Sequence, residues 1–160
     1  MTEIDYTALK NAVITILKAK TTLWVAGDVG SSGTFTMIER GLPNNNKFDG
    51  LKYPCCFVTN DETLETDKPF GPIIANVGTV SEHIVKLKII FFNLDGDGQA
   101  VEDSLDALHK IIKETLKADF NLGGLVTESW TTSSTSFSGD YRGKALDGRI
   151  IILVCKIHTS

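Results

Sequence analysis

The chain has 160 residues, of which 42% are hydrophobic and 22% are charged, and its formal net charge is −4. This composition excludes an intrinsically disordered chain, and the length favours a single domain over residues 1–160 with one sizeable core. Proteins that hold nucleic acid without regard to sequence usually carry a basic stripe. The sequence supplies none, so tight binding of DNA or RNA is not expected.

The N-terminal residues and the cysteines indicate where the protein folds. Residues 1–5 lack the basic and apolar regions of a signal peptide, and no apolar run approaches the roughly 20 residues that span a bilayer, so no membrane partner is expected. Cys55, Cys56 and Cys155 form an odd set without regular spacing, which favours a reducing compartment. We therefore expect the protein to fold in a cytoplasm.

The first predicted element is a helix that begins after Asp5, a residue able to cap an N-terminus, and runs to about Lys20. Apolar residues recur along it at the spacing of one helical face, which we expect to be buried. They are Leu9, Val13, Ile16 and Leu17.

The following span, residues 26–54, is rich in Gly, Ser and Asn and reads as a long loop. A loop of this length in a compact domain is usually functional or mobile. One short strand, residues 34–39, interrupts it, with Phe35 and Met37 on one side and Ile38 on the other.

A short apolar strand is predicted over residues 55–59, where Cys55 and Cys56 point to opposite faces and cannot easily form a disulfide with each other. A second loop, residues 60–72, is expected to follow, and it gathers acidic side chains. These acids are Asp61, Glu62, Glu65 and Asp67.

The strongest strand signal covers residues 80–93. One face is entirely apolar and is expected to be buried; it carries Val85, Leu87, Ile89 and Phe91. The other face is amphipathic, so part of it can meet solvent or a partner chain. It carries Ile84, Lys86, Lys88, Ile90 and Phe92.

A second amphipathic helix is predicted from Val101 to Leu116 and should stop near Gly123-Gly124, where positive φ costs nothing. Asp106 and Lys110 stand one turn apart in the order that favours an ion pair. The apolar stripe consists of Val101, Leu105, Leu108, Ile111, Ile112 and Leu116.

The rest of the chain reads as two strands. Residues 125–137 are rich in Ser and Thr and suit a polar, exposed strand or hairpin, with a turn at residues 138–140. The last strand, residues 144–158, carries Ile151, Leu153, Cys155 and Ile157 on one face. The element order predicts an α+β fold, with a mainly antiparallel sheet and two amphipathic helices packed on one face. The strands near Leu87 and Leu153 are expected to be central, and they can be adjacent.

Two stretches match ligand-binding loops only in part. Residues 93–99 begin like a calcium loop, but Ser104 stands where a bidentate Glu is required, and a strand precedes the loop. Residues 27–33 are rich in glycine, but they lack the Lys of a phosphate loop, and Asp28 would repel an anion. We therefore expect no metal and no cofactor.

Candidate catalytic groups are few. Cys155 has apolar neighbours, which oppose a thiolate, although a Cys–His pair with His83 or His158 stays open. His109 lies beside the polar side of its helix and is expected to be solvated. The acids of residues 60–72 can include catalytic carboxylates, but an acidic, solvated loop is far more common. We therefore do not expect the protein to be an enzyme. A small cytosolic enzyme that uses Cys155 or this loop is the alternative of another class.

Four segments of the chain occur in a particular order. They are the helix at residues 6–19, YPCCFV at 53–58, SEHIVKLKIIFF at 81–92, and the helix from Val101 followed by NLGGLV at 121–126 and a strand pair ending at Ile157. Their order and the length of the chain resemble those of the tail terminator (tail completion) proteins of long-tailed bacteriophages. The likeness covers most of the chain, but the loops at residues 26–54 and 60–72 are larger than the family pattern leads us to expect.

The resemblance implies a structural virion protein that forms a ring, typically a hexamer, on the head-proximal end of the tail tube. The ring would end tube polymerisation and offer a surface to the head. The implied partners are further copies of the chain, the major tail tube protein and a head-closure or connector protein, while DNA passes through without specific binding. Assembly would take place in the host cytoplasm. A head-closure or connector adaptor on the other side of the same joint is the runner-up.

Candidate oligomer or lumen residues follow from this resemblance. The four acids of residues 60–72 would face either the lumen, where they keep DNA from adhering, or a neighbouring subunit. Lys86 and Lys88 on the amphipathic strand face and Trp130 in the Ser/Thr-rich segment are candidate subunit contacts. Ordinary solvated surface is the alternative for each of them.

Overall fold

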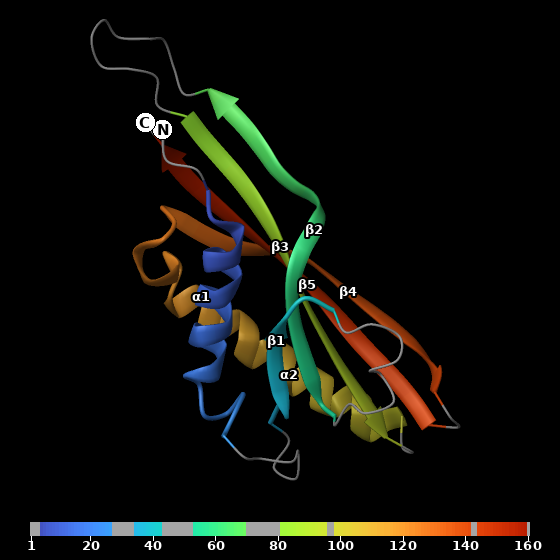
Figure 1. Cartoon of the computed structure of the whole chain (residues 1–160). Coiled ribbons are helices and arrows are strands. Elements are labelled where there is room, and N and C mark those ends of the chain that lie inside the picture. Colours follow the sequence, from blue (N-terminus) through green and yellow to red (C-terminus); the bar gives the residue numbers. More distant parts are fainter. Residues whose placement is uncertain are drawn as a thin grey trace, which may run out of the picture.

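The computed structural model describes residues 4–26, 34–42, 53–69, 81–95, 98–141 and 144–159. These residues form an α+β fold in which a five-stranded, mainly antiparallel sheet carries two α-helices on one face (Figure 1). In chain order the elements are α1 (Tyr6–Lys18), β1 (Met37–Arg40), β2 (Cys55–Pro69), β3 (Ser81–Asp95), α2 (Gly98–Ala118), the 3₁₀ turn η2 (Leu122–Gly124), β4 (Glu128–Tyr141) and β5 (Lys144–Thr159).

Helix α1 begins where the sequence predicts. The Asp5 carboxylate accepts a hydrogen bond from the backbone N–H of Ala8 at 2.9 Å, a cap that stabilises a helix by about 1 kcal/mol. The helix ends at Lys18, two residues before the predicted end, because the N–H of Lys20 turns back to the carbonyl of Leu17. Of the predicted stripe, Ile16 is only half-buried. Leu9, Val13 and Leu17 are buried.

Helix α2 buries the predicted stripe except for Ile111, which is half-buried. It ends at Ala118, before the predicted glycines, because the Asp119 carboxylate accepts the N–H of Gly123 at 3.2 Å and the chain tightens into η2. Gly123 and Gly124 then adopt φ values of 70° and 96°. These positive angles explain why glycine is needed in this connection.

The strand order is β1-β2-β3-β5-β4, so β3 lies at the centre and β5 beside it, as the apolar patterns indicated. Leu87 and Leu153 are direct cross-strand partners. All neighbouring pairs are antiparallel except β1 with β2, which is parallel.

Two predictions of irregular structure are wrong, because strand pairing continues through the segments concerned. The predicted acidic loop at residues 60–72 is strand up to Pro69: after a register shift between Asn60 and Glu65, β2 pairs with β3 as far as Pro69↔Ser81. The predicted turn at residues 138–140 lies inside β4, which continues to the pair Tyr141↔Lys144. In both places the ladder satisfies backbone groups that a loop would leave to water.

The short strand predicted at residues 34–39 is shifted. Strand β1 begins at Met37, and Phe35 forms an isolated bridge with Trp24 instead. Phe35 and Ile38 are both buried in the same cluster, although they were predicted on opposite sides. The irregular backbone before β1 breaks the alternation on which that prediction depended. The glycine-rich residues 27–33 and residues 43–52 lie outside the described part of the chain.

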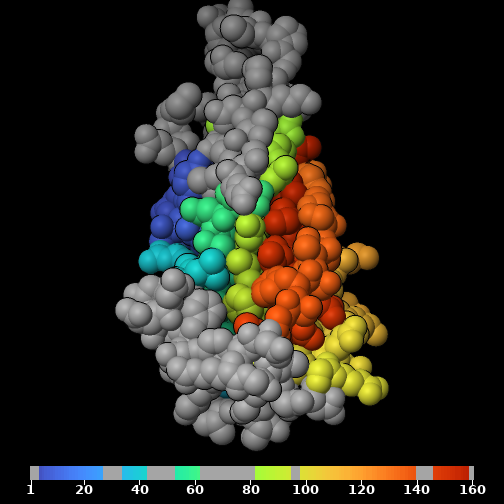
Figure 2. Space-filling view, turned by 90° about the vertical axis from the view of Figure 1, so that its right-hand side faces the viewer, coloured from blue at the N-terminus to red at the C-terminus, as the bar shows by residue number. Residues whose placement is uncertain are grey.

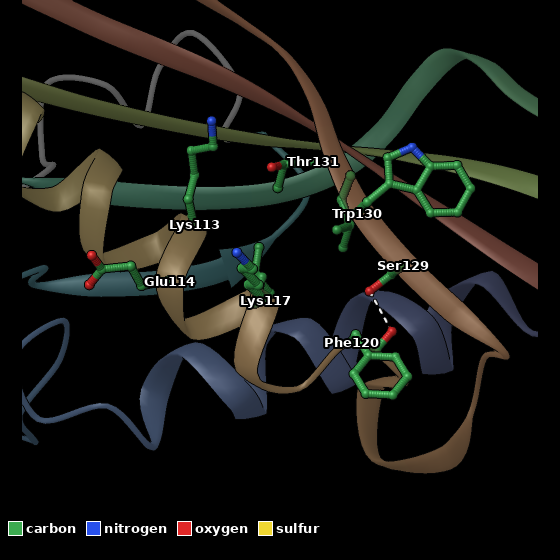
Figure 3. A pocket seen from close by; sticks show the side chains of 9 residues that line it. Lys113, Glu114, Lys117, Phe120, Ser129, Trp130 and Thr131 are labelled. Carbon is green, nitrogen blue, oxygen red and sulfur yellow. Dashed lines mark hydrogen bonds between the residues drawn. The ribbon is translucent and has the colours of Figure 1, made fainter.

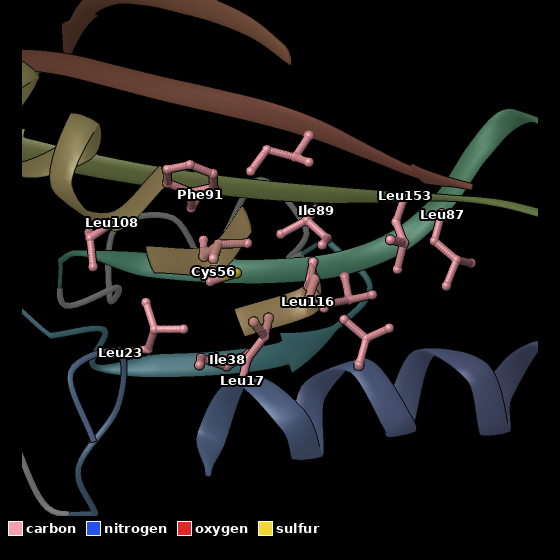
Figure 4. Close-up of a cluster of buried hydrophobic side chains, with 14 of the residues drawn as sticks. Leu17, Leu23, Ile38, Cys56, Leu87, Ile89, Phe91, Leu108, Leu116 and Leu153 are labelled. Carbon is pink, nitrogen blue, oxygen red and sulfur yellow. The ribbon is translucent and has the colours of Figure 1, made fainter. Parts of the chain in front are cut away.

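Apolar side chains form two clusters, one on each face of the sheet. The larger cluster lies between the helices and the sheet and includes Leu17, Leu87, Phe91, Leu116 and Leu153 (Figure 4). The smaller cluster lies on the opposite face and consists of Cys55, Phe57, Ile90 and Phe92. Cys55 and Cys56 therefore point to different faces, as predicted.

An aromatic side chain extends the smaller cluster across the sheet. Phe137 on β4 packs edge-on against Phe92, with ring centroids 5.3 Å apart. Between them on β5 lies Gly148, which pairs with both residues, and a Cβ atom on Gly148 would overlap the Phe137 ring. A glycine within a strand often marks such a close approach.

We predict that Gly148→Ala lowers the free energy of unfolding by about 1–3 kcal/mol, because the new methyl group displaces the Phe137 ring. Urea denaturation monitored by circular dichroism measures the loss. Gly139→Ala on β4 is the matched control, because no atom lies within 4 Å of the added carbon. Equal stability of the two variants would show that Phe137 does not need the space above Gly148.

Candidate functional site

One face of the sheet carries no helix among the described residues, and this helix-free face is the first candidate interaction surface. Strands β3, β5 and β4 lie side by side on it (Figure 2). A row across these strands pairs Lys86 with Val154 and Val154 with Trp130. Val154 is 4% exposed and Trp130 is 40% exposed, so the indole is placed to shield the valine while offering a large apolar surface.

Charged side chains flank this row. The Lys156 ammonium lies 3.2 Å from a Glu82 carboxylate oxygen and 3.5 Å from a Glu128 carboxylate oxygen. The hydrogen bond and the charge of Glu82, and then Glu128, raise the pKa of Lys156. On the other side of the row, Lys88 lies 3.9 Å from Asp61. Ion pairs therefore lie on both sides of the row formed by Lys86, Val154 and Trp130.

The structure places the predicted surface residues on three strands, β2, β3 and β4. Lys86 and Lys88 lie half-buried on the helix-free face of β3, and Trp130 is exposed on β4. Asp61 meets Lys88. The remaining acids are Glu62, Glu65 and Asp67; they lie in strand β2 rather than in a loop, and their side chains are outside the described part of the structure.

The two edges of the sheet form a second candidate surface, and they differ from each other. Strand β1 is four residues long and closes one edge, whereas β4 spans 14 residues and closes the other. Large apolar side chains that are exposed among the described residues all lie in segments at or leading to these edge strands. Val25 and Leu42 precede and follow β1, and Phe120, Leu125, Trp130 and Phe137 lie on β4 or on the connection that leads to it.

A groove that the sequence did not predict opens between the second half of α2 and β4 (Figure 3). Its volume is about 290 Å³. The buried side chains of Leu116 and Leu153 line it, with Lys113, Lys117 and Phe120 around them. Phe120 is 53% exposed, so much of its ring is open to solvent beside the groove. The sequence signal for this groove was Phe120, which lies just beyond the end of α2. Lys113 and Lys117 precede it and lie one helical turn apart.

Two further contacts join α2 to the sheet. Arg149 on β5 donates to the Asp106 carboxylate at 2.7 Å, so the acid that was predicted to pair with Lys110 binds a residue of the sheet instead. His109 is half-buried, its Nε2 lies 3.2 Å from the Ser134 hydroxyl, and its ring packs edge-on against Phe91. The prediction of a solvated His109 is therefore wrong, because α2 lies closer to β4 than the helix pattern alone could show.

The Ser134–His109 contact lacks the third member of a catalytic triad. The Nδ1 atom of His109 is buried without a hydrogen-bond partner, and the nearby Asp106 carboxylate is taken by Arg149. Desolvation by burial, together with Lys113 and Arg149, lowers the pKa of His109 despite the opposing charge of Asp106. Within the part of the chain that the structure describes, no group orients this imidazole as a base toward the serine hydroxyl.

The three cysteines are free and buried. Burial raises the pKa of Cys55 and Cys155 to about 12, and it raises the pKa of Cys56 further, with a contribution from the neighbouring Cys55. The prediction that Cys155 is a core residue is confirmed. Such thiols stay protonated at neutral pH and are poor nucleophiles.

Within residues 4–26, 34–42, 53–69, 81–95, 98–141 and 144–159, no group of three or more His, Cys, Asp or Glu side chains is placed to hold a metal ion. None of the helices in this part of the chain combines the length and the apolar character needed to cross a membrane. In comparisons with known proteins, no protein-family model and no curated protein matched the chain.

We predict that His109 makes the protein less stable in acid. Its pKa in the folded state lies below the ordinary value of 6.5, so the unfolded chain binds the proton more readily as the pH falls through that range. Between about pH 7.5 and about pH 5, wild type should lose more unfolding free energy than His109→Gln. Urea denaturation at both pH values measures the difference, with His158→Gln at an exposed position as control. An identical loss in wild type and His109→Gln would contradict the prediction.

We predict that iodoacetamide at about pH 8 leaves all three cysteines of the native protein unmodified, because burial holds their pKa values far above that pH. Intact-mass measurement should show alkylation only after unfolding in urea. Rapid modification of Cys155 alone in the native protein would instead reveal an activated thiolate and would revive the enzyme alternative.

Proposed function

We propose that the protein is a structural virion protein that forms a ring at the head-proximal end of a phage tail tube. In this role the ring ends tube polymerisation and offers the surface to which the head attaches. The order of segments in the sequence supports the proposal, and so does a surface suited to contacts between identical chains. Its partners would be further copies of the chain, the tail tube protein and a head-closure or connector protein.

The observation that carries the proposal is the pair of unlike sheet edges. A ring of identical subunits needs a heterologous contact, in which one patch of each copy meets a different patch of the next. The chain has two such patches at opposite ends of one sheet: the short parallel strand β1, flanked by Val25 and Leu42, and the long strand β4 with Trp130 and Phe137. Exposed apolar side chains of this size usually mark an interaction surface when they gather.

The helix-free face adds a second argument. Both helices pack on one face, and the opposite face exposes Trp130 beside half-buried apolar residues and lysines. A subunit with one closed layer and one open face can contact its neighbours through the open face without disturbing its main core. As part of the proposal, the resemblance implies that the acids of residues 61–67 face a lumen through which DNA passes, where like charges keep the DNA from adhering.

We predict that the protein associates into a closed ring, alone at high concentration or on tail tubes, and that Trp130→Asp weakens this association. The substitution replaces an exposed indole with a charge at the β4 edge, whereas circular dichroism should show an unchanged fold. Native mass spectrometry and electron micrographs of the protein mixed with tail tubes measure the assembly. Asn11→Asp, on the exposed side of α1, is the control for the added charge. A protein that stays monomeric and adds no ring to tail tubes would overturn the proposal.

A head-closure or connector adaptor remains the second candidate, because the same open face and edges could serve the other side of the joint. Deletion of the gene separates the two roles. Loss of a terminator should leave overlong or unjoined tails. Loss of a head-closure protein should leave tails of normal length beside heads that leak DNA.

A further inference from the structure

The groove between α2 and β4 has two different walls. One wall is a helix that presents the alkyl chains of Lys113 and Lys117 and ends beside the exposed ring of Phe120. The other wall is β4, which contributes Ser129 and Thr131. The Ser129 hydroxyl donates to the carbonyl of Phe120 at 2.7 Å and holds the two walls together at one end (Figure 3).

Strand β4 ends the sheet, and no other described strand pairs with its outer edge. Beside the groove, β4 pairs with β5 in regular register over four residues, from Glu128↔Lys156 to Thr131↔Leu153, before the register shifts. An extended peptide can add to such an edge as a further strand. Main-chain hydrogen bonds then supply affinity, and a pocket for alternate side chains supplies specificity.

The charged side chains around the groove determine which kind of peptide segment can bind there. Lys113 and Lys117 lie one helical turn apart, where like charges repel each other unless an anion is bound nearby. Glu114 also lines the groove, but it projects at the end away from Phe120 (Figure 3). The end next to Leu116 and Phe120 therefore suits an apolar side chain that is followed or preceded by a carboxylate.

We propose that the β4 edge and this groove bind an extended segment of a partner protein in which an apolar side chain is flanked by acidic residues. The segment pairs with Glu128–Thr131 as an added strand, its apolar side chain lies against Leu116, Leu153 and Phe120, and its carboxylates meet Lys113 and Lys117. This site shares the β4 edge with the contact proposed for the ring, so a bound segment and a neighbouring subunit would compete for Glu128–Thr131. The peptide experiment below uses the chain without tail tubes and can fail while the ring proposal stands.

The experiment uses the full chain, isotope-labelled for NMR, and the synthetic peptide Ser-Asp-Thr-Leu-Thr-Asp-Ser. In an added strand its Leu and both Asp side chains share one face, because side chains alternate. We expect saturable shifts of the backbone amides of residues 128–131 and of the second half of α2. A peptide with Lys in place of Asp should bind roughly tenfold more weakly, since two attractive charge pairs become repulsive.

Matched variants identify the contacts. Lys113→Glu with Lys117→Glu should reverse the preference, so that the Lys-containing peptide binds better than the Asp-containing one. Lys20→Glu with Lys110→Glu makes the same change in net charge at exposed positions outside the groove and should preserve the original order. Phe120→Ala should weaken binding of the Asp-containing peptide, whereas Leu125→Ala, exposed but outside the groove, should not.

Three results would overturn the proposal. Absence of saturable shifts in the wild type would show that the groove binds no such segment. Shifts with sodium decanoate but with neither peptide would assign the groove to a small amphiphile. Loss of self-association in the Lys113→Glu, Lys117→Glu variant, without peptide-induced shifts in wild type, would assign it to a second copy of the chain; the ring would then stand while this inference fails.

Discussion

The pairing of β3 with β5 joins the two most apolar strands of the chain, and it runs in unbroken register from Ser81↔Thr159 to Asp95↔Ala145. Cross-strand partners share a face, so Leu87 and Leu153 lie together under the helices. A slip of one residue would turn every side chain of one strand to the opposite face. The register therefore decides which face the helices cover, and it leaves Lys86 and Val154 on the face without helices.

That division explains why the chain has two kinds of surface. The helix layer closes one face, and the smaller aromatic cluster occupies only part of the other. The ring of Phe137 on β4 packs over Gly148 against this cluster and so holds the second half of β4 on the sheet. Trp130, at the other end of β4, stays exposed on the same face. The surfaces that we assign to binding are those that no described residue of the chain covers.

Local sequence patterns correctly predicted both helices, the two long apolar strands and the α+β class. In these elements the spacing of the apolar residues matches the face that is buried. The patterns failed where pairing between distant segments overrides composition: the acidic residues after Asn60 lie in β2 because they pair with β3. The contacts of His109 and the groove beside Phe120 depend on where α2 crosses β4, and no single segment encodes that distance. Alternation alone could place Lys86 and Lys88 on the amphipathic face of β3, whereas Trp130 could be placed only within a polar, exposed segment.

Hydrogen–deuterium exchange, compared between the free protein and the protein assembled on tail tubes, distinguishes the strands that stabilise the subunit from those that contact partners. We infer that the helix layer stabilises the subunit itself, whereas β4 and the helix-free face contact partner proteins. We expect the slowest exchange in β3 and β5 in the free protein. On assembly we expect new protection in β4, because no described strand pairs with its outer edge. New protection confined to α1 and α2, with β4 unchanged, would contradict this inference.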